Sequence, residues 1–166
     1  MMNIEMISHW ITPEEQKAGF LYLQCQHDTA IFGSYILIAT KERAIVLEKG
    51  ISSGMGEVSD KHWNQLISIR FQLGSWFSYS KLTLKFFRYP CHNPIPNNPK
   101  VRWDLLIPKK TNTIEMIHFL QRQETDARAC RAEMESQYLM MRPRLGALRA
   151  KHAGLPYDSE TEHLKR

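Results

Sequence analysis

Apolar and polar residues alternate with the period of β-strands along the first two thirds of the chain. Three early runs, FLYLQCQ (20–26), GSYILIAT (33–40) and RAIVLEKG (43–50), are rich in aromatic and β-branched residues and end at polar residues or glycine. They predict three strands, and the short polar step at Lys41 and Glu42 predicts a hairpin between the last two. A short helix is expected over 13–18, because Thr12 is a good N-cap and Pro13 suits the first helical position.

Three further strands are predicted in the middle of the chain. Residues 66–73 alternate strictly between apolar and polar positions, residues 76–89 contain the alternating stretch KLTLK, and residues 101–108 form a last apolar run that Pro108 closes. The stretches ISSGMGEVSD (51–60) and PCHNPIPNNPK (90–100) are rich in glycine, proline, serine or asparagine, and we expect both to be loops.

From about residue 111 the apolar period becomes helical. The apolar stripe first comprises Ile114, Ile117, Phe119 and Leu120, and it then thins to Ala127, Met134, Tyr138, Met141, Leu145 and Leu148. The later spacing predicts a weak heptad seam, because Glu124 and Arg131 occupy positions that apolar residues would complete. Pro143 is expected to end or kink the helix, or to open a second one as a residue of its first turn.

Strands followed by one helix are typical of an α+β domain in which the helix covers the open end of a curved antiparallel sheet. We expect four parts: an N-terminal segment with a short helix (1–18), a β-domain with the start of the covering helix (19–121), a helical extension kinked near Pro143 (122–153), and a disordered tail (154–166). The length of 166 residues and the hydrophobic content of 43% suit one domain with its own core.

The order of these runs resembles the bacterial pleckstrin-homology-like (PH-like) domains. The turn from Thr40 to Arg43 matches a Thr-x-x-Arg turn between two hydrophobic strands, and Leu66, Ile67 and Ile69 followed by Gly74 match a later strand. The stretch from Asn112 through Leu120 corresponds to the covering helix. The resemblance spans about residues 19 to 121, and it implies an antiparallel β-barrel or sandwich capped by a long C-terminal helix, with a role in binding or assembly.

Relatives of this family that bind phosphoinositides use a basic cluster between their first two strands. Here the corresponding loop, HDTAIFG, contains Asp28 and no lysine or arginine, which argues against phosphoinositide recognition. The net charge of +5 and the pI of about 9.2 permit an acidic partner without requiring one.

The cysteines and the N-terminus predict a cytoplasmic protein, and the resemblance to bacterial PH-like domains implies a bacterial one. Cys25, Cys91 and Cys130 are widely spaced and odd in number, which indicates a reducing compartment rather than a disulfide framework. The N-terminal residues lack the features of a signal peptide, and the longest apolar run (30–39) is too short to span a membrane.

Motifs for catalysis are missing from the sequence. It contains no G-x-S-x-G, no G-x-x-x-x-G-K-[ST] and no H-E-x-x-H, and the glycines of Gly54-Met55-Gly56 lack the lysine that a phosphate-binding loop needs. His62 and His118 have no partners at metal-ligand spacing, and adjacency does not make Cys91 and His92 a metal site or a dyad. We therefore predict a protein that is not an enzyme, with no metal and no cofactor.

Three sets of residues are candidates for binding. A protein partner is expected to contact Trp76, Phe77, Tyr79 and Arg88, because neighbouring aromatics on a strand point to opposite faces and some must be exposed. A basic amphipathic stretch, Arg142, Arg144, Arg149 and Lys151, is a weaker candidate for polyanions. Oligomerisation is assigned to Met134, Tyr138 and Met141.

The function predicted from these features is that of a protein-binding adaptor that self-associates through its C-terminal helix. The alternative is a small basic nucleic-acid-binding protein or regulator of the phage-bacterium conflict type, in which aromatics interleaved with Lys81, Lys85 and Arg88 stack on bases. An enzyme with an unrecognised site is the third hypothesis.

Overall fold

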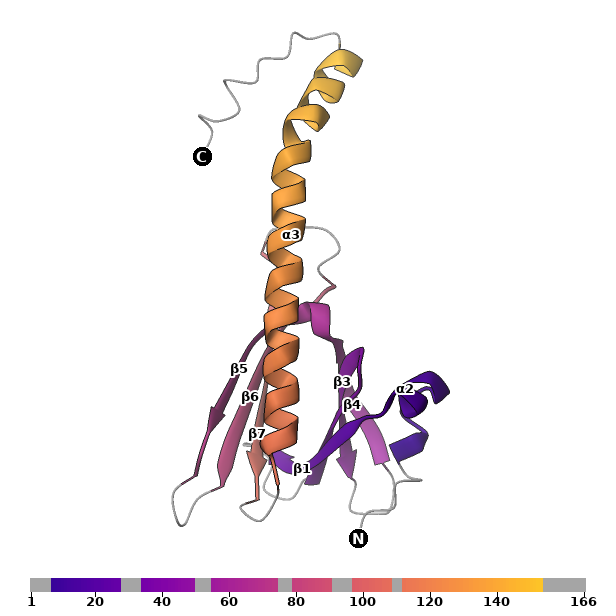
Figure 1. Ribbon diagram of the computed structural model, residues 1–166, viewed down its shortest axis with the longest axis vertical. Coiled ribbons are helices and arrows are strands. Elements are labelled where there is room, and N and C mark those ends of the chain that lie inside the picture. The colour runs from indigo at the N-terminus through magenta and orange to yellow at the C-terminus, as the bar shows by residue number, and fades with distance from the viewer. Residues whose placement is uncertain are drawn as a thin grey trace. The chain divides into compact units, whose positions relative to one another are not determined.

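A computed structural model describes residues 7–27, 34–49, 55–74, 79–90, 97–108 and 112–153 (Figure 1). Within these ranges one antiparallel sheet has the strand order β4-β3-β2-β1-β7-β6-β5. The elements are α2 (Pro13–Ala18), β1 (Leu21–His27), β2 (Ser34–Ala39), β3 (Arg43–Lys49), β4 (Met55–His62), η1 (Trp63–Gln65), β5 (Leu66–Gln72), β6 (Ser80–Phe87), β7 (Lys100–Ile107) and α3 (Ile114–Ala153).

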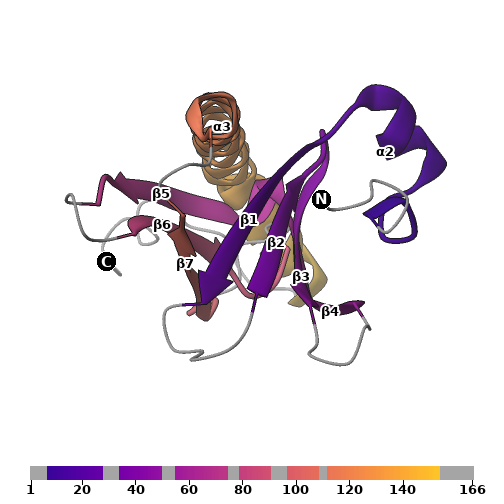
Figure 2. The same ribbon diagram turned by 90° about the horizontal axis from the view of Figure 1, so that it is seen from below.

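The sheet is a meander whose two groups of strands meet at β1 and β7. Strands β1 to β4 pair in chain order, as do β5 to β7, and β1 joins β7 at the pairs Gln26↔Leu106 and His27↔Leu105. Figure 2 shows the two groups diverging from this junction. In the described part of the chain β4 and β5 are the two edges and do not pair with each other, so the sheet is open. The predicted α+β order is confirmed, whereas a closed barrel is not formed.

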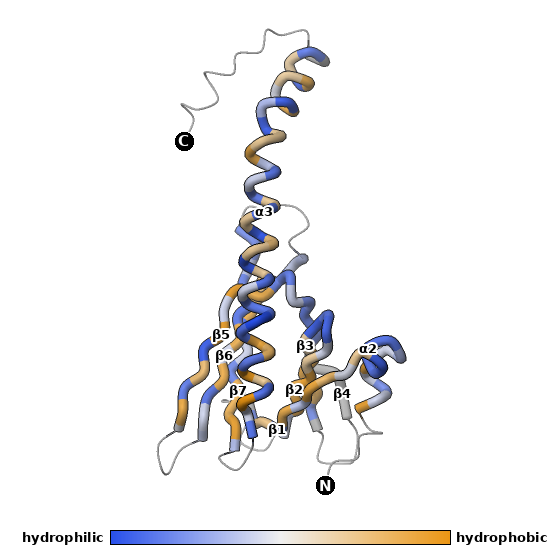
Figure 3. The backbone as a smooth tube through the Cα atoms, viewed as in Figure 1, coloured by the Kyte–Doolittle hydropathy of each residue, from blue (hydrophilic) through white to orange (hydrophobic). Residues whose placement is uncertain are grey.

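The main core lies between the two groups of strands and the first part of α3. It includes Leu23, Leu37, Val46, Leu66, Leu82, Leu84, Phe86, Trp103, Leu105, Met116, Leu120 and Ala127. The ring centroids of Phe86 and Trp103 are 4.7 Å apart, and Trp63 meets Phe119 of α3 edge to face at 5.8 Å. Hydrophobic and hydrophilic positions alternate along β5 and β6 in Figure 3, because one face of these strands contacts this core.

A second core lies on the opposite face of β2 and β3. Ile36 and Ile38 of β2, with Ile45 and Leu47 of β3, pack there against Ile7 and Ile11 from the N-terminal segment. Both faces of these two strands are therefore covered, which explains why GSYILIAT and RAIVLEKG are almost continuously apolar rather than alternating. The N-terminal segment is part of the folded domain rather than an appendage to it.

One expectation about secondary structure is wrong. Residues 51–60 were expected to be a loop, but Met55–His62 forms β4, an edge strand whose pairing with β3 depends on backbone hydrogen bonds rather than on apolar side chains. Of the alternatives for Pro143, an end of the helix and a second helix are excluded, because α3 continues through it to Ala153, and the kink stays a prediction. The predicted tail, residues 154–166, lies outside the described residues.

The chain divides into two compact units, Met1–Arg128 and Ala129–Arg166. Ala127, which was expected on the apolar stripe beyond the covering segment, belongs to the first unit and is 4% exposed in the main core. Nearby, a carboxylate oxygen of Glu124 accepts a hydrogen bond from the backbone N–H of Ile69 on β5, at 3.3 Å. The helix segment that covers the core therefore extends at least to Ala127, beyond the expected boundary at residue 121.

Candidate functional site

The second unit carries a line of exposed apolar residues along the helix. Tyr138, Met141, Leu145 and Leu148 are between 45% and 55% exposed, and Met134 is half-buried. Successive members of this set are four, three, four and three residues apart, so they lie on one side of an α-helix. We call these five residues the seam. It contains the predicted oligomerisation residues Met134, Tyr138 and Met141, and Leu145 and Leu148 extend it.

Charged residues flank the seam unevenly. Glu135, Arg142 and Arg149 follow one side of it, and Gln137, Arg144 and Lys151 follow the other. Arg144, Arg149 and Lys151 are exposed and Arg142 is half-buried. The four residues predicted to bind polyanions thus border the seam itself, and the acidic residues Glu133 and Glu135 lie toward its N-terminal end.

Tyr79 and Arg88, two of the four residues predicted to contact a protein partner, lie at opposite ends of β6. Tyr79 is 48% exposed just before β6, whereas Arg88 is exposed just after β6. At about 3.3 Å per residue they lie roughly 30 Å apart, so one small patch does not hold both. The guanidinium carbon of Arg88 lies 6.0 Å from the ring centroid of Tyr89, another exposed aromatic. Trp76 and Phe77 lie outside the described residues, and their part in partner binding stays a prediction.

The outer face of β5, β6 and β7, which points away from the main core, is basic. Arg70, Lys81, Lys85 and Arg102 line a hollow of about 360 Å³ there, with Arg128 and Glu124 of α3. Asp104 links two strands on this face, since its carboxylate accepts hydrogen bonds from the Thr83 hydroxyl of β6 at 2.7 Å and from Arg102 of β7 at 2.9 Å. Apolar and polar residues alternate in β5 and β6, and this pattern predicts a polar face on each strand. Only the strand pairing shows that β5, β6 and β7 form one face.

The Thr-x-x-Arg turn fixes the N-terminal segment to the sheet. Arg43 forms a two-pronged ion pair with Glu15, with nitrogen–oxygen distances of 3.0 and 3.1 Å, and a further pair with Asp60 at 3.0 Å. The Thr40 hydroxyl donates to Glu15 at 2.8 Å, while Glu15 and Thr12 form a capping box at the start of α2. This network of buried and half-buried groups has a structural role, because it connects the N-terminal segment to β3 and β4.

The electrostatics of this network agree with that role. The Arg43 guanidinium beside it lowers the pKa of Glu15 from 4.5 to about 2, against the opposing effect of burial. Conversely, the hydrogen bond to Glu15 raises the pKa of Arg43 above its ordinary value. Both groups are therefore held in their charged forms.

Groups suited to covalent chemistry are few in the described ranges. Cys25 is buried, its thiol lies 3.6 Å from the Tyr35 carbonyl oxygen, and burial raises its pKa to about 12, so the thiolate nucleophile is not available. Among the residues that the structure describes, there is no group of three His, Cys, Asp or Glu side chains that could hold a metal. Cys91, His92 and Gly54 lie outside those ranges.

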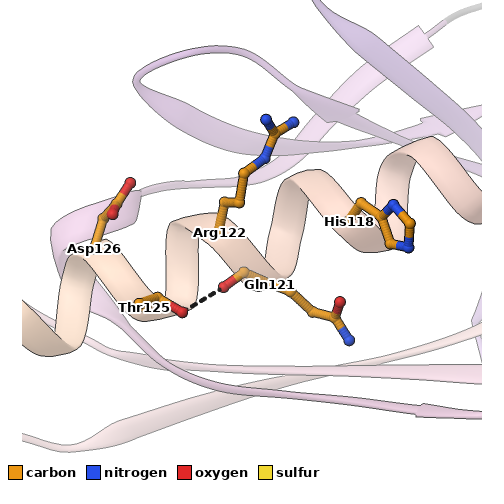
Figure 4. Close-up of a pocket in the computed structure, with 5 residues that line it drawn as sticks. All are labelled: His118, Gln121, Arg122, Thr125 and Asp126. Atoms are coloured by element: carbon orange, nitrogen blue, oxygen red, sulfur yellow. Dashed lines mark hydrogen bonds between the residues drawn. The ribbon is translucent and has the colours of Figure 1, made fainter.

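A hollow on α3 is lined by an imidazole, that of His118, but it lacks the elements of a catalytic site. Figure 4 shows its lining residues, His118, Gln121, Arg122, Thr125 and Asp126, which all come from one exposed side of the helix. The bond drawn there joins the Thr125 hydroxyl to the Gln121 carbonyl oxygen at 3.1 Å, a local contact within the helix. No side chain from a second element lines this hollow.

None of the helices in the described ranges combines the length and apolar character needed to cross a membrane. Comparison with models of known protein families gives no match, and neither does a search of curated proteins.

Proposed function

We propose that this chain is a non-catalytic binding module of the PH-like class that self-associates through the seam of its C-terminal helix. Two observations support the PH-like class: the meander of seven described strands followed by a helix that packs on the core, and the Thr40–Arg43 turn between β2 and β3. The observation that carries the function is the seam, because its five apolar residues repeat at heptad spacing on a helix where four of them are about half exposed.

An apolar helix stripe of this kind gains free energy when a second apolar stripe covers it. Burying a Leu or Met side chain contributes about 1.5–3 kcal/mol when the side chain starts fully exposed, and roughly half of that applies here. Association costs several kcal/mol in lost translational and rotational freedom, so five positions per helix predict a dissociation constant on the order of micromolar. A reversible dimer follows.

The charges beside the seam favour a second copy of this chain in the antiparallel orientation. In a parallel pair, Arg144 of one helix faces Arg149 of its partner, and this like-charge contact occurs twice. In an antiparallel pair the half that contains Glu133 and Glu135 lies beside the partner's basic half, which contains Arg142 and Arg149. Opposite charges therefore meet beside the seam only in the antiparallel orientation.

Pro143 is compatible with this pairing. It lies two residues after Met141 and two before Leu145, a spacing that places it away from the seam on the outer side of the helix. The carbonyl group that loses its hydrogen bond to proline then faces solvent, where water satisfies it.

Solution mass tests the proposal on the full chain. Sedimentation equilibrium should give a mass approaching twice 19.5 kDa as the concentration rises through about 100 µM, as expected for a micromolar dimer. The double variant Met141→Glu and Leu145→Glu places charge in the seam and should stay at 19.5 kDa. The matched control, Met140→Glu and Ala147→Glu, adds the same charge on the opposite side of the helix and should still dimerise. A monomeric parent, or equal behaviour of the two variants, refutes self-association through the seam.

Nucleic-acid binding is the second candidate, and the exposed Arg144, Arg149 and Lys151 favour it. Replacing these three residues and Arg142 with Gln should weaken binding to DNA or RNA and flatten its dependence on salt, because fewer counterions are released. If the parent chain binds neither at low salt in an anisotropy titration, this candidate is excluded.

A further inference from the structure

The outer face of β5–β7 is a regular grid of side chains, most of which are polar. The pairing registers place Ser68, Lys85 and Arg102 in one row across the three strands, Arg70, Thr83 and Asp104 in the next, and Gln72, Lys81 and Leu106 in the third. Neighbouring strands lie about 4.8 Å apart, so side chains in one row are within reach of a single small ligand. The hollow of about 360 Å³ lies over this grid, and α3 contributes Glu124 and Arg128 to its lining.

The two carboxylates of this region are already occupied. Asp104 forms a close ion pair with Arg102, whose Nε lies 2.7 Å from Oδ2, and Lys81 lies 3.7 Å from the same carboxylate. Glu124 pairs with Arg128 and accepts from the backbone of Ile69. They pair with Arg102 and Arg128, but they leave the face with a positive excess, because five cations line the hollow.

Part of this positive charge lacks a partner. Arg70 and Lys85 are exposed, and neither makes a hydrogen bond or an ion pair with any residue in the described ranges. The Ser68 hydroxyl and the Gln72 amide, which also line the hollow, are likewise free of such contacts within those ranges. Four donor side chains from β5 and β6 are therefore available to a ligand.

One cross-strand pair on this face brings two cations together. Lys85 on β6 and Arg102 on β7 are directly paired and point to the same side, and the ion pair of Arg102 with Asp104 reduces the repulsion that like charges opposite each other produce in a sheet. Arrangements that break a local stability rule are commonly found at functional sites. An anion placed between Lys85, Arg102 and Arg70 would turn this repulsion into attraction.

We propose that this face binds the phosphate monoester group of a small molecule, with Arg70, Lys85 and Arg102 as its main contacts. A doubly charged phosphate matches the positive excess, and its oxygens accept the forked hydrogen bonds that arginine donates. The volume of the hollow falls in the range of small-molecule sites. None of the lining residues is aromatic, so the face has no platform on which nucleic-acid bases stack. This site is separate from the seam and independent of self-association.

A titration of the full chain at constant ionic strength tests the site. Inorganic phosphate and ribose 5-phosphate, exchanged against chloride, should shift the backbone amide resonances of β5, β6 and β7 in a saturable manner. Arg70→Gln and Lys85→Gln should each weaken this binding at least about tenfold, because each removes a charged hydrogen-bond donor. Arg70→Lys should recover part of it. Lys41→Gln and Arg122→Gln, which remove the same charge from exposed positions elsewhere, should leave the affinity within about twofold.

The proposal is overturned if the shifts rise linearly without saturation, or if the control variants weaken binding as much as Arg70→Gln. It is also overturned if a single-stranded oligonucleotide shifts the same resonances at far lower concentration with a steep salt dependence, since that result identifies a nucleic-acid surface. Well-dispersed spectra of each variant show that the fold is retained.

Discussion

Replacing Glu15 with Gln should make the domain less stable and remove much of its sensitivity to acid. The side chain of Glu15 is 6% exposed, and it accepts hydrogen bonds from the Thr12 backbone, the Thr40 hydroxyl and the Arg43 guanidinium. Gln keeps the size of the side chain but loses its charge and half of its acceptor capacity. Arg43 then retains Asp60, a partner whose side chain is 42% exposed.

The magnitude follows from the pKa of Glu15, which is lowered from 4.5 to about 2 in the folded protein. At about 1.4 kcal/mol per pKa unit, this shift corresponds to about 3 kcal/mol of stability at neutral pH. Because the folded-state pKa is the lower one, the contribution is complete above pH 4.5 and is lost as the pH falls toward 2. The variant should lack this contribution at every pH.

Urea unfolding at a series of pH values between 7 and about 2.5 measures this effect. The free energy of unfolding of the parent should fall toward that of Glu15→Gln as the solution is acidified, so that the difference between the two curves shrinks from about 3 kcal/mol at pH 7. The comparison cancels the contributions of other carboxylates, including Asp104, whose pKa is also lowered by its partners Arg102 and Thr83. Parallel curves, or a difference below about 0.5 kcal/mol at pH 7, would refute the assignment of Glu15 as a buried ion-pair partner.

Three further substitutions test the packing, each by urea unfolding at neutral pH. Phe86→Ala should lower the free energy of unfolding by about 3–5 kcal/mol, because Phe86 is fully buried, whereas Tyr79→Ala should change it by less than about 0.5 kcal/mol, because Tyr79 is half exposed. Trp63→Phe should cost about 1–3 kcal/mol, since it leaves the buried Thr40 carbonyl without its indole donor at 2.9 Å. A Tyr79→Ala cost equal to that of Phe86→Ala, or a neutral Trp63→Phe, would contradict the packing described above.

Most of the strands could be predicted from the sequence, because the alternation of apolar and polar residues and the presence of turn residues depend on short stretches of chain. The hairpin at Lys41 and Glu42, the strands later seen as β5, β6 and β7, and the start of the long helix all follow from such signals. Strand β4 could not, because an edge strand held by backbone hydrogen bonds has no apolar pattern. The second core could not be predicted either, because the burial of Ile7 and Ile11 depends on contact with a strand face that is distant in the sequence.

Of the candidate sites, the seam could be predicted from the sequence and the polar grid could not. Heptad spacing is a property of one helix, so the sequence predicted an apolar stripe that contains all five seam residues, and it assigned Met134, Tyr138 and Met141 to oligomerisation. The grid around Lys85 depends on strand register, which joins residues far apart in the chain, and the sequence alone shows only that β5 and β6 each have a polar side. The length of β6 also separates Tyr79 from Arg88, both of which were predicted to contact a partner.

The distance between spin labels on Cys130 of two copies tests self-association through the seam most directly. Cys130 is exposed on α3, and the changes Cys25→Ala and Cys91→Ser leave it as the one labelled position. An antiparallel dimer that pairs the seam residues places the two labels about 30–40 Å apart, at 1.5 Å of helix rise per residue. A parallel dimer places them within about 20 Å, because the two cysteines then lie at the same height on adjacent helices. We predict the longer distance, its loss in the variant Met141→Glu and Leu145→Glu, and its retention in Met140→Glu and Ala147→Glu. A short distance would contradict the antiparallel orientation, and the absence of any dipolar coupling between copies at about 100 µM would contradict self-association itself.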